Sequence, residues 1–153
     1  MQESRIFELT LLLHTCATFV MVGIIWMVQL VHYPLFAQVG ETSFRTYEIA
    51  HMNAMSLLVM PVMLVELLTG LALIALPSSV GIAQWMPLAS LGLIAALWFV
   101  TLFVNLPQHS SLSTGFSADL HSTLVQSNWI RTALWTGRGI LVLWMLERLT
   151  ASP

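Results

Sequence analysis

The chain of 153 residues contains no lysine, one cysteine and few charged residues of any kind. Charged side chains make up 8% of it and hydrophobic ones 58%, whereas a soluble domain carries about a quarter charged residues. This composition excludes an ordinary soluble domain and is typical of an integral membrane protein. The net charge of -2 also excludes the basic surface that phosphate contacts need, so no nucleic-acid partner is expected.

The single cysteine, Cys16, lies in an apolar run, so no disulfide within the chain is expected and it gives no indication of the redox compartment. The first ten residues carry one arginine against two glutamates, which is a poor start for a cleaved signal peptide. The apolar run that follows is also too long for a signal peptide. We therefore expect this run to remain as the first helix.

Four apolar runs each exceed the ~20 residues that a helix needs to cross the hydrocarbon core of a membrane. They extend over Ile6 to Phe36, Thr46 to Leu76, Gln84 to Leu106 and Asn128 to Leu149. The sequence thus predicts an all-α fold, a single four-helix transmembrane domain over residues 1–153 with both termini on one side of the membrane. Arginines flank the two sides almost equally, so the positive-inside rule gives no orientation.

Prolines mark the ends of three predicted spans. Pro34, Pro77 and Pro107 are expected to end their helices, whereas Pro61 lies inside the second span and predicts a kink. A short turn follows Pro77. The longest connection follows Pro107, and its second half, Phe116 to Gln126, could form a short interfacial helix before the fourth span.

Each predicted helix brings one histidine to the same membrane face: His32, His51, His109 and His121. Glu48 lies one helical turn before His51 and shares its helix face, and Asp119 lies two residues before His121. Imidazole-rich sites suit iron, copper or zinc rather than magnesium or calcium. One or two such histidines could simply lie among lipid headgroups. Four of them, with Glu48, favour a mono- or dinuclear transition-metal site.

Two charged residues fall near the centres of their apolar runs. An unpaired charge at the middle of a bilayer costs roughly 3 kcal/mol on insertion scales, so Glu66 and Arg138 are expected to face inward and pair, directly or through water. Such a pair could also serve only to fix helix register. Arg131 lies seven residues before Arg138 on the same face, toward the histidines, where it could orient an anionic substrate group.

Helical periodicity predicts which faces point into the bundle. In the first span the inward stripe contains His14, Thr18, Met21, Ile25, Gln29 and His32, and in the second it contains His51, Met55, Leu58, Val62 and Glu66. His14 and His32 are about 27 Å apart along one helix at ~1.5 Å rise per residue, so the two cannot belong to one site.

Two stretches resemble a known membrane family. LLLHTCATFVMVGIIWMVQLVHYPLF, with its early histidine, central tryptophan and Pro-Leu-Phe, is similar to the first helix of HemJ-type protoporphyrinogen oxidases, and SLLVMPVMLVELLTGLALI resembles their second helix. Small four-helix proteins of the copper-resistance D and anthrone-oxygenase-like types share this layout. The resemblance implies a haem b protein with His14 as the haem-binding histidine. The family's functional lysine has no counterpart in this chain.

Two functions from different classes follow. The first is a membrane redox enzyme of oxidase or oxygenase type, in which an iron or copper site (zinc is the further option) at His32, His51, His109 and His121 acts on a lipid-soluble substrate. Glu48 or Asp119 would then be a ligand or proton acceptor, and Arg131 would orient the substrate. The second is a non-catalytic protein that carries haem or metal for electron transfer or delivery.

A structural membrane subunit is a third option. The expected partners are the lipid bilayer and a hydrophobic small molecule. The sequence does not determine whether the protein forms a homo-oligomer. If the source is bacterial, the expected location is the inner membrane.

Overall fold

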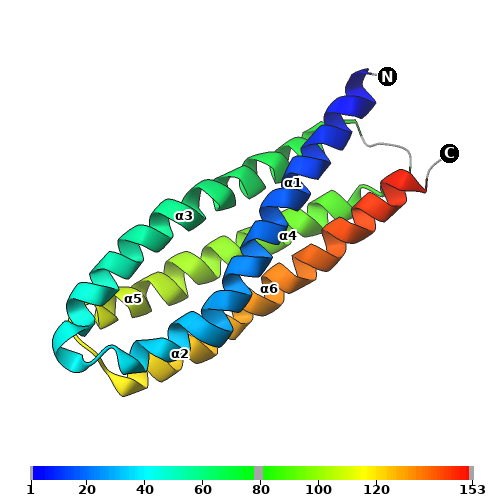
Figure 1. Cartoon of the computed structure of the whole chain (residues 1–153). Helices are drawn as coiled ribbons and strands as arrows, with labels where there is room; N and C mark the ends of the chain where they lie inside the picture. Colours follow the sequence, from blue (N-terminus) through cyan, green and yellow to red (C-terminus); the bar gives the residue numbers. More distant parts are fainter. Residues whose placement is uncertain (1, 78–80, 152–153) are drawn as a thin grey trace.

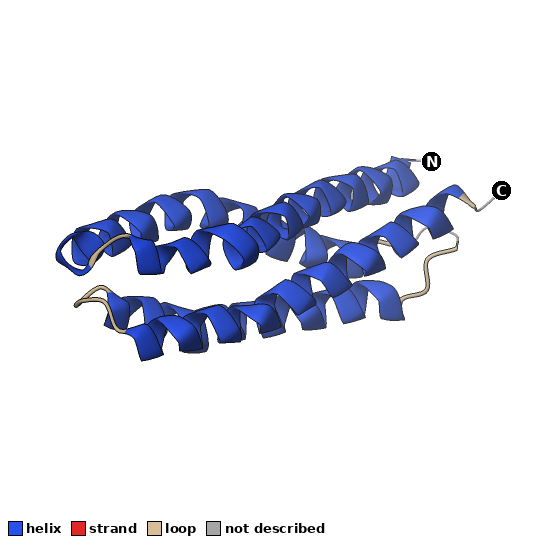
Figure 2. Ribbon diagram, turned by 60° about the horizontal axis from the view of Figure 1, so that its bottom comes forward, coloured by secondary structure: helices blue, strands red, loops and turns tan. Residues whose placement is uncertain are grey.

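The computed structural model describes residues 2–77 and 81–151, and side chains from residue 5 onward. The described residues form helices joined by short connections, with no strand among them (Figure 2). Four long helical rods lie alongside one another, and the two ends of the chain lie at the same end of the molecule (Figure 1). The prediction of an all-α fold with four helices is confirmed.

The first rod combines α1 (Gln2–Met27), the π-helical turn η1 (Val28–His32), α2 (Tyr33–Leu35) and the 3-10 turn η2 (Phe36–Gln38). The second rod is α3 (Glu41–Ala75). The third combines α4 (Trp85–Val100), the π-helical turn η3 (Thr101–Asn105) and α5 (Leu106–Leu112), and the fourth is α6 (Ala118–Thr150). α1 and α4 each pack against both α3 and α6.

Three helical segments are long and apolar enough to cross a membrane: Arg5–Gln38, Glu41–Ala75 and Trp85–Leu112. In the described part of the chain α6 is not among them, because its arginines and other polar side chains lower its mean hydropathy. Some of these polar side chains face inward, whereas others, such as Glu147 and Arg148, are exposed. Arg131 and Arg138 are buried, whereas Ile140 and Leu143 are more than half exposed.

Two prolines do not end their helices. A five-residue π turn precedes each by one residue, η1 before Pro34 and η3 before Pro107, and the N–H that follows each turn bonds to the carbonyl five residues back. A proline lacks its own N–H and crowds the carbonyl four residues before it, and the wider π turn accommodates this. Pro34 nevertheless lies near the end of its span, since the first rod ends at Gln38. The prediction that Pro107 ends its span was wrong, because the third rod continues to Leu112 and carries His109.

The other two prolines differ. α3 ends at Ala75, just before Pro77, as predicted, and it continues through Pro61 as one helix. The turn expected after Pro77 includes residues 78–80, which lie outside the described residues.

No separate interfacial helix precedes the fourth rod. α6 begins at Ala118 and is continuous, so the expected short helix is its first turns. The Ser117 side chain caps this start by accepting a hydrogen bond from the Leu120 N–H (3.4 Å), and Asp119 lies in the first turn, where a negative charge is favourable. Since neither glycine nor proline follows before residue 137, nothing interrupts the helix.

The inward stripe of α1 is buried as predicted, from His14 and Thr18 through Gln29. In α3 the stripe is shifted at one position. Val59 is buried, whereas Leu58 is 51% exposed. The predicted stripe was wrong there because a period of 3.6 leaves the choice between two adjacent residues open.

Candidate functional site: a histidine cluster beside a cavity

Three of the predicted histidines come together at the end of the bundle away from the termini. We define the histidine cluster as His32, Tyr33, Glu48, His51 and His109, which η1, α2, α3 and α5 supply. Nε2 of His32 lies 2.8 Å from Nδ1 of His51, and the rings of His51 and His109 have centroids 5.2 Å apart. Both π turns lie beside the cluster. η1 ends at His32, just before Tyr33, and η3 carries the third rod past Pro107 to His109.

A hydrogen-bonded chain crosses the cluster. Nδ1 of His109 is 2.5 Å from Oε1 of Glu48, and Nε2 of the same ring is 2.7 Å from the hydroxyl of Tyr33. Glu48 is fully buried and Tyr33 is 3% exposed. The other carboxylate oxygen of Glu48, Oε2, has no hydrogen-bond partner.

The direction of this chain follows from what each group can donate. An ionised carboxylate only accepts, so Nδ1 of His109 donates to Glu48. If the ring were an imidazolium, Nε2 would donate as well, and the hydroxyl proton of Tyr33 would have no acceptor. The arrangement that satisfies all three groups is a neutral His109 whose Nε2 accepts the hydroxyl proton of Tyr33.

Two predicted residues lie outside the cluster. His121 is half-buried; its Nε2 donates to the backbone carbonyl of Tyr33 (2.7 Å), and its ring stacks on Phe36. Asp119 is exposed at the start of α6. The continuous helix explains this, because it keeps Asp119 in its first turn at the surface. In this arrangement Asp119 is not positioned as a ligand or proton acceptor.

A cavity of about 340 Å³ adjoins the histidine cluster. Tyr33, His51, His109 and Arg131 contribute to its polar end. Nearly half of its apolar lining residues are methionines: Met21, Met52, Met55, Met60 and Met63. Among its lining residues Ser56 of α3 and Leu102 and Leu106 of η3 and α5 are exposed. The cavity therefore reaches the outer surface of the bundle between α3 and the η3–α5 segment.

Buried polar atoms around this cavity lack partners. They are Oγ1 of Thr101, Oδ1 of Asn105 and Nε of Arg131. Arg131 is held by a hydrogen bond from its Nη1 to Asn128 Oδ1 (3.2 Å), with its guanidinium over the ring of Trp135 (5.3 Å to the centroid). Because buried polar groups are normally hydrogen-bonded, these atoms are available to a bound molecule.

Sequence reasoning missed Tyr33 and Asn105. The sequence contains one pattern that marks both places: a polar residue two positions before a proline, in His32-Tyr33-Pro34 and in Asn105-Leu106-Pro107. These are the two places where a π turn occurs, and such turns are frequent at functional sites. Gln29 was predicted only to face inward; its amide oxygen accepts from Asn128 (3.0 Å) and ties α6 to the first rod.

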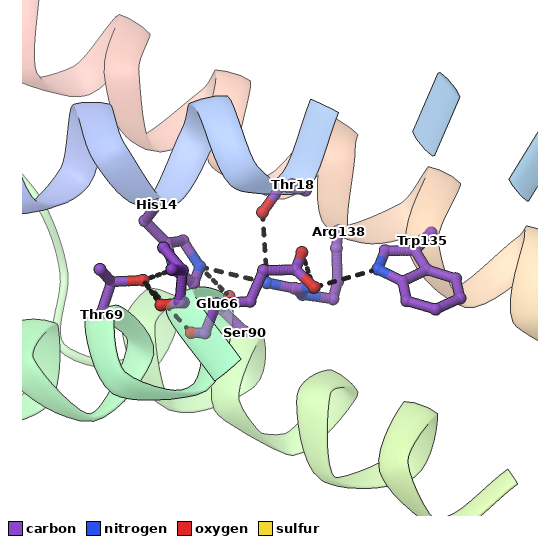
Figure 3. Close-up of polar contacts among 8 residues, drawn as sticks. His14, Thr18, Glu66, Thr69, Ser90, Trp135 and Arg138 are labelled. Carbon is purple, nitrogen blue, oxygen red and sulfur yellow. Dashed lines mark hydrogen bonds and ion pairs between the residues drawn. The ribbon is translucent and has the colours of Figure 1, made fainter. Parts of the chain in front are cut away.

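A second polar network lies between the rods on the terminal side of the histidine cluster, and Figure 3 shows its contacts. We define the central network as the ion pair Glu66–Arg138, its hydrogen-bond partners His14, Thr18, Thr69 and Trp135, and Ser90, which contacts His14. Nη1 of Arg138 is 2.5 Å from Oε1 of Glu66, and Oε2 of Glu66 accepts from the indole N–H of Trp135 (3.3 Å). The pair expected from the sequence is thus direct.

His14 belongs to this central network rather than to the histidine cluster. Its Nδ1 lies 2.7 Å from the hydroxyl of Thr69, and its Nε2 lies 3.2 Å from Ser90 Oγ and 3.3 Å from Nη2 of Arg138. A guanidinium can only donate, so Nε2 of His14 accepts and the ring is neutral with its proton on Nδ1.

The haem role that the HemJ resemblance implies does not fit this arrangement. Both ring nitrogens of His14 are engaged and the residue has no exposed surface. Nor do the described residues contain a group of three or more His, Cys, Asp or Glu side chains arranged to hold a metal ion. Instead, Nε2 of His32 contacts Nδ1 of His51, and the two ring nitrogens of His109 contact Glu48 and Tyr33.

Comparisons of the chain with protein-family models, curated proteins and solved structures find no match.

Proposed function

We propose that the protein is a multi-pass membrane protein in which all four rods cross the bilayer, with both termini on one side. Three segments with suitable length and apolar composition support this for the first three rods. For α6 the support is its outward face, where Ile140 is 66% exposed and Leu143 is 51% exposed. Two of its arginines, Arg131 and Arg138, lie inside the bundle, and the exposed Arg148 lies in its last turn, at the terminal end of the rod.

The function we propose is that of a membrane redox enzyme, of oxidase or oxygenase type, that acts on a lipid-soluble substrate bound in the cavity. The single observation that supports this most strongly is the cavity itself, which joins a methionine-rich apolar body to a polar end and opens sideways on the bundle. Ligand sites are typically mostly apolar with a few placed polar groups. A side opening between α3 and the η3–α5 segment would face the lipid, where such a substrate dissolves.

The polar end fits a substrate that carries a hydroxyl or carbonyl group, such as a quinone or a phenol. Tyr33 and His51 would hydrogen-bond this group, and Arg131 would orient it through its unpartnered Nε. The Glu48–His109 pair would hold or accept the proton that a redox reaction of such a group releases. Proton transfer by a positioned side chain requires this kind of contact at 2.6–3.2 Å, directly or through one water.

A metal-dependent form of this function is the second candidate, and the spacing of two histidines favours it. Two imidazole nitrogens that bind one ion at ~2.0–2.1 Å lie about 2.8–3.4 Å apart for angles of ~90–110°, and those of His32 and His51 are 2.8 Å apart, at the lower limit. The Glu48 contact to Nδ1 of His109 is of the kind that orients a ligating histidine. Metal binding would require Nε2 of His109 to leave Tyr33, and the same site could serve non-catalytic metal delivery.

Binding of a short-chain quinone tests the first candidate. We expect purified protein in nanodiscs to bind this probe in equilibrium dialysis and Met55→Trp, which fills the cavity, to lose the binding. Leu57→Trp is the matched control, because Leu57 lies two residues away on the same helix and is 80% exposed. Equal binding by both variants would contradict the cavity as the substrate site.

Metal content tests the second candidate. Protein purified from cells supplied with iron, copper and zinc should contain at least one transition-metal ion per chain, and His51→Ala should lose it. Metal-free wild-type protein that also fails to take up added iron, copper or zinc would reject the metal-dependent form while leaving the quinone experiment unaffected.

A further inference from the structure

The hydrogen-bonded chain from Tyr33 through His109 to Glu48 has a use that substrate binding does not require. We infer that Tyr33 is a redox-active residue, which a strong one-electron oxidant reaching the cavity converts to a neutral tyrosyl radical. The oxidant gains one electron from the phenol. The phenolic proton moves to Nε2 of His109, and the proton on Nδ1 of His109 moves to Oε1 of Glu48.

The geometry provides both proton transfers. The hydroxyl of Tyr33 lies 2.7 Å from Nε2 of His109, and Nδ1 of that ring lies 2.5 Å from the carboxylate of Glu48. The ring is neutral before and after the step, with its proton exchanged from one nitrogen to the other. No group has to move by more than the length of a proton transfer.

Burial favours the coupled step over loss of the electron alone. An electron removed from Tyr33 without its proton would leave a cation in a site where Tyr33 is 3% exposed, and unpaired charge in such a site is costly. In the coupled step the buried carboxylate becomes a neutral acid. Glu48, which is fully buried with one oxygen unpartnered, thereby loses its charge as the electron leaves.

Tyr47, the only other tyrosine in the sequence, can be compared directly with Tyr33. Tyr47 is half-buried and stacks on the ring of His51, but among the described residues its hydroxyl has no hydrogen-bond partner. It therefore lacks the proton acceptor that Tyr33 has. This difference makes Tyr47→Phe the informative variant, because Tyr33 is then the only tyrosine in the protein.

The experiment oxidises the purified full-length protein with a photo-excited ruthenium tris-bipyridine complex and an irreversible electron acceptor, and detects radicals by electron paramagnetic resonance. Protein grown with ring-deuterated tyrosine separates a tyrosyl signal, which narrows, from the signals of the six tryptophans, which do not. We expect a tyrosyl radical in the wild type and in Tyr47→Phe, and its loss in Tyr33→Phe. In Glu48→Gln the yield should fall by at least about tenfold, because the amide oxygen accepts the hydrogen bond from His109 but cannot take up its proton.

A tyrosyl signal that is absent from the wild type, or that disappears in Tyr47→Phe, would overturn the inference. An unchanged yield in Glu48→Gln would overturn the role of Glu48 as final proton acceptor. The biological use of this radical rests on the proposed redox function, whereas the formation of the radical does not. Because the assay contains no cavity ligand, a positive radical result with failed quinone binding would reject the substrate site and keep the redox-active tyrosine.

Discussion

The central network and the histidine cluster are both buried polar sites between the same rods, yet they differ in how completely their atoms are paired. In the central network Nε of Arg138 is the one buried side-chain polar atom, among the described residues, without a partner. Around the histidine cluster and its cavity four such atoms lack partners, on Glu48, Thr101, Asn105 and Arg131. Residues of the second site line a cavity, whereas none of those in the central network does.

This difference separates a structural role from a functional one. A buried charge pair with satisfied neighbours fixes how helices face each other, and breaking it is costly. Unpartnered polar atoms beside a cavity reduce stability and have a use only when something binds there. We therefore expect substitutions in the central network to change stability most, and those in the cluster to change binding and redox chemistry most.

The largest effect is expected from breaking the ion pair. Glu66→Ala or Arg138→Ala leaves an uncompensated buried charge, and each should lower the free energy of unfolding by roughly 3–5 kcal/mol. Unfolding in mixed detergent followed by circular dichroism measures this. The matched control is Glu66→Leu combined with Arg138→Met, which removes both charges and should cost much less than either single alanine variant; equal losses in all three would show that the charges do not matter.

A smaller effect is expected where α3 approaches α4 beside His14. A Cβ added at Gly70 would lie 2.9 Å from Cδ1 of Ile94 and 3.5 Å from Cε1 of His14. Because the isoleucine end can shift, Gly70→Ala should cost only about 1 kcal/mol of stability. Gly92→Ala, whose Cβ meets nothing within 4 Å, should cost nothing in the same unfolding experiment. If the two variants prove equally stable, α3 and α4 do not pack as closely at Gly70 as described.

The smallest stability change is expected in the cluster. Glu48→Gln keeps the shape and an acceptor for Nδ1 of His109 while removing a buried charge, so the free energy of unfolding should change by about 1 kcal/mol or less. Affinity for the quinone probe should nevertheless fall, since the weaker hydrogen bond from an amide holds His109 less firmly in the cavity lining. A large loss of stability with unchanged affinity would place Glu48 among the structural residues.

The gathering of His32, His51 and His109 could be predicted because adjacent spans run in opposite directions and bring alternate ends together. Pairing inside the bundle could be predicted where a charged residue had only one residue of opposite charge at the same predicted depth in the membrane, as for Glu66 and Arg138. Side-chain partners could not be predicted where they depend on how each helix is rotated about its axis. The contacts of Tyr33 with His109 and of Ser90 with His14 are examples. A rotation of one residue exchanges such partners without changing the hydrophobic pattern.

The start of α6 was also misjudged, for a different reason. Polar residues between Ser117 and Asn128 resemble a surface connection, and the sequence shows only their polarity. In the folded chain they line one continuous helix whose inner side meets the first rod, for example where Gln29 contacts the backbone carbonyl of Val125 (3.2 Å). Tertiary contacts of this kind extend a helix beyond its apolar run.

The most direct test of the division between the two sites compares His51→Ala with His14→Ala, with affinity for the quinone probe and transition-metal content measured in both. His51 lines the cavity, whereas His14 lies in the central network away from it. We predict that His51→Ala loses the probe, and any metal, at nearly wild-type stability, and that His14→Ala keeps both while becoming less stable. The account would be contradicted if His51→Ala kept the probe affinity and the metal while a folded His14→Ala protein lost them. That result would place the function in the central network.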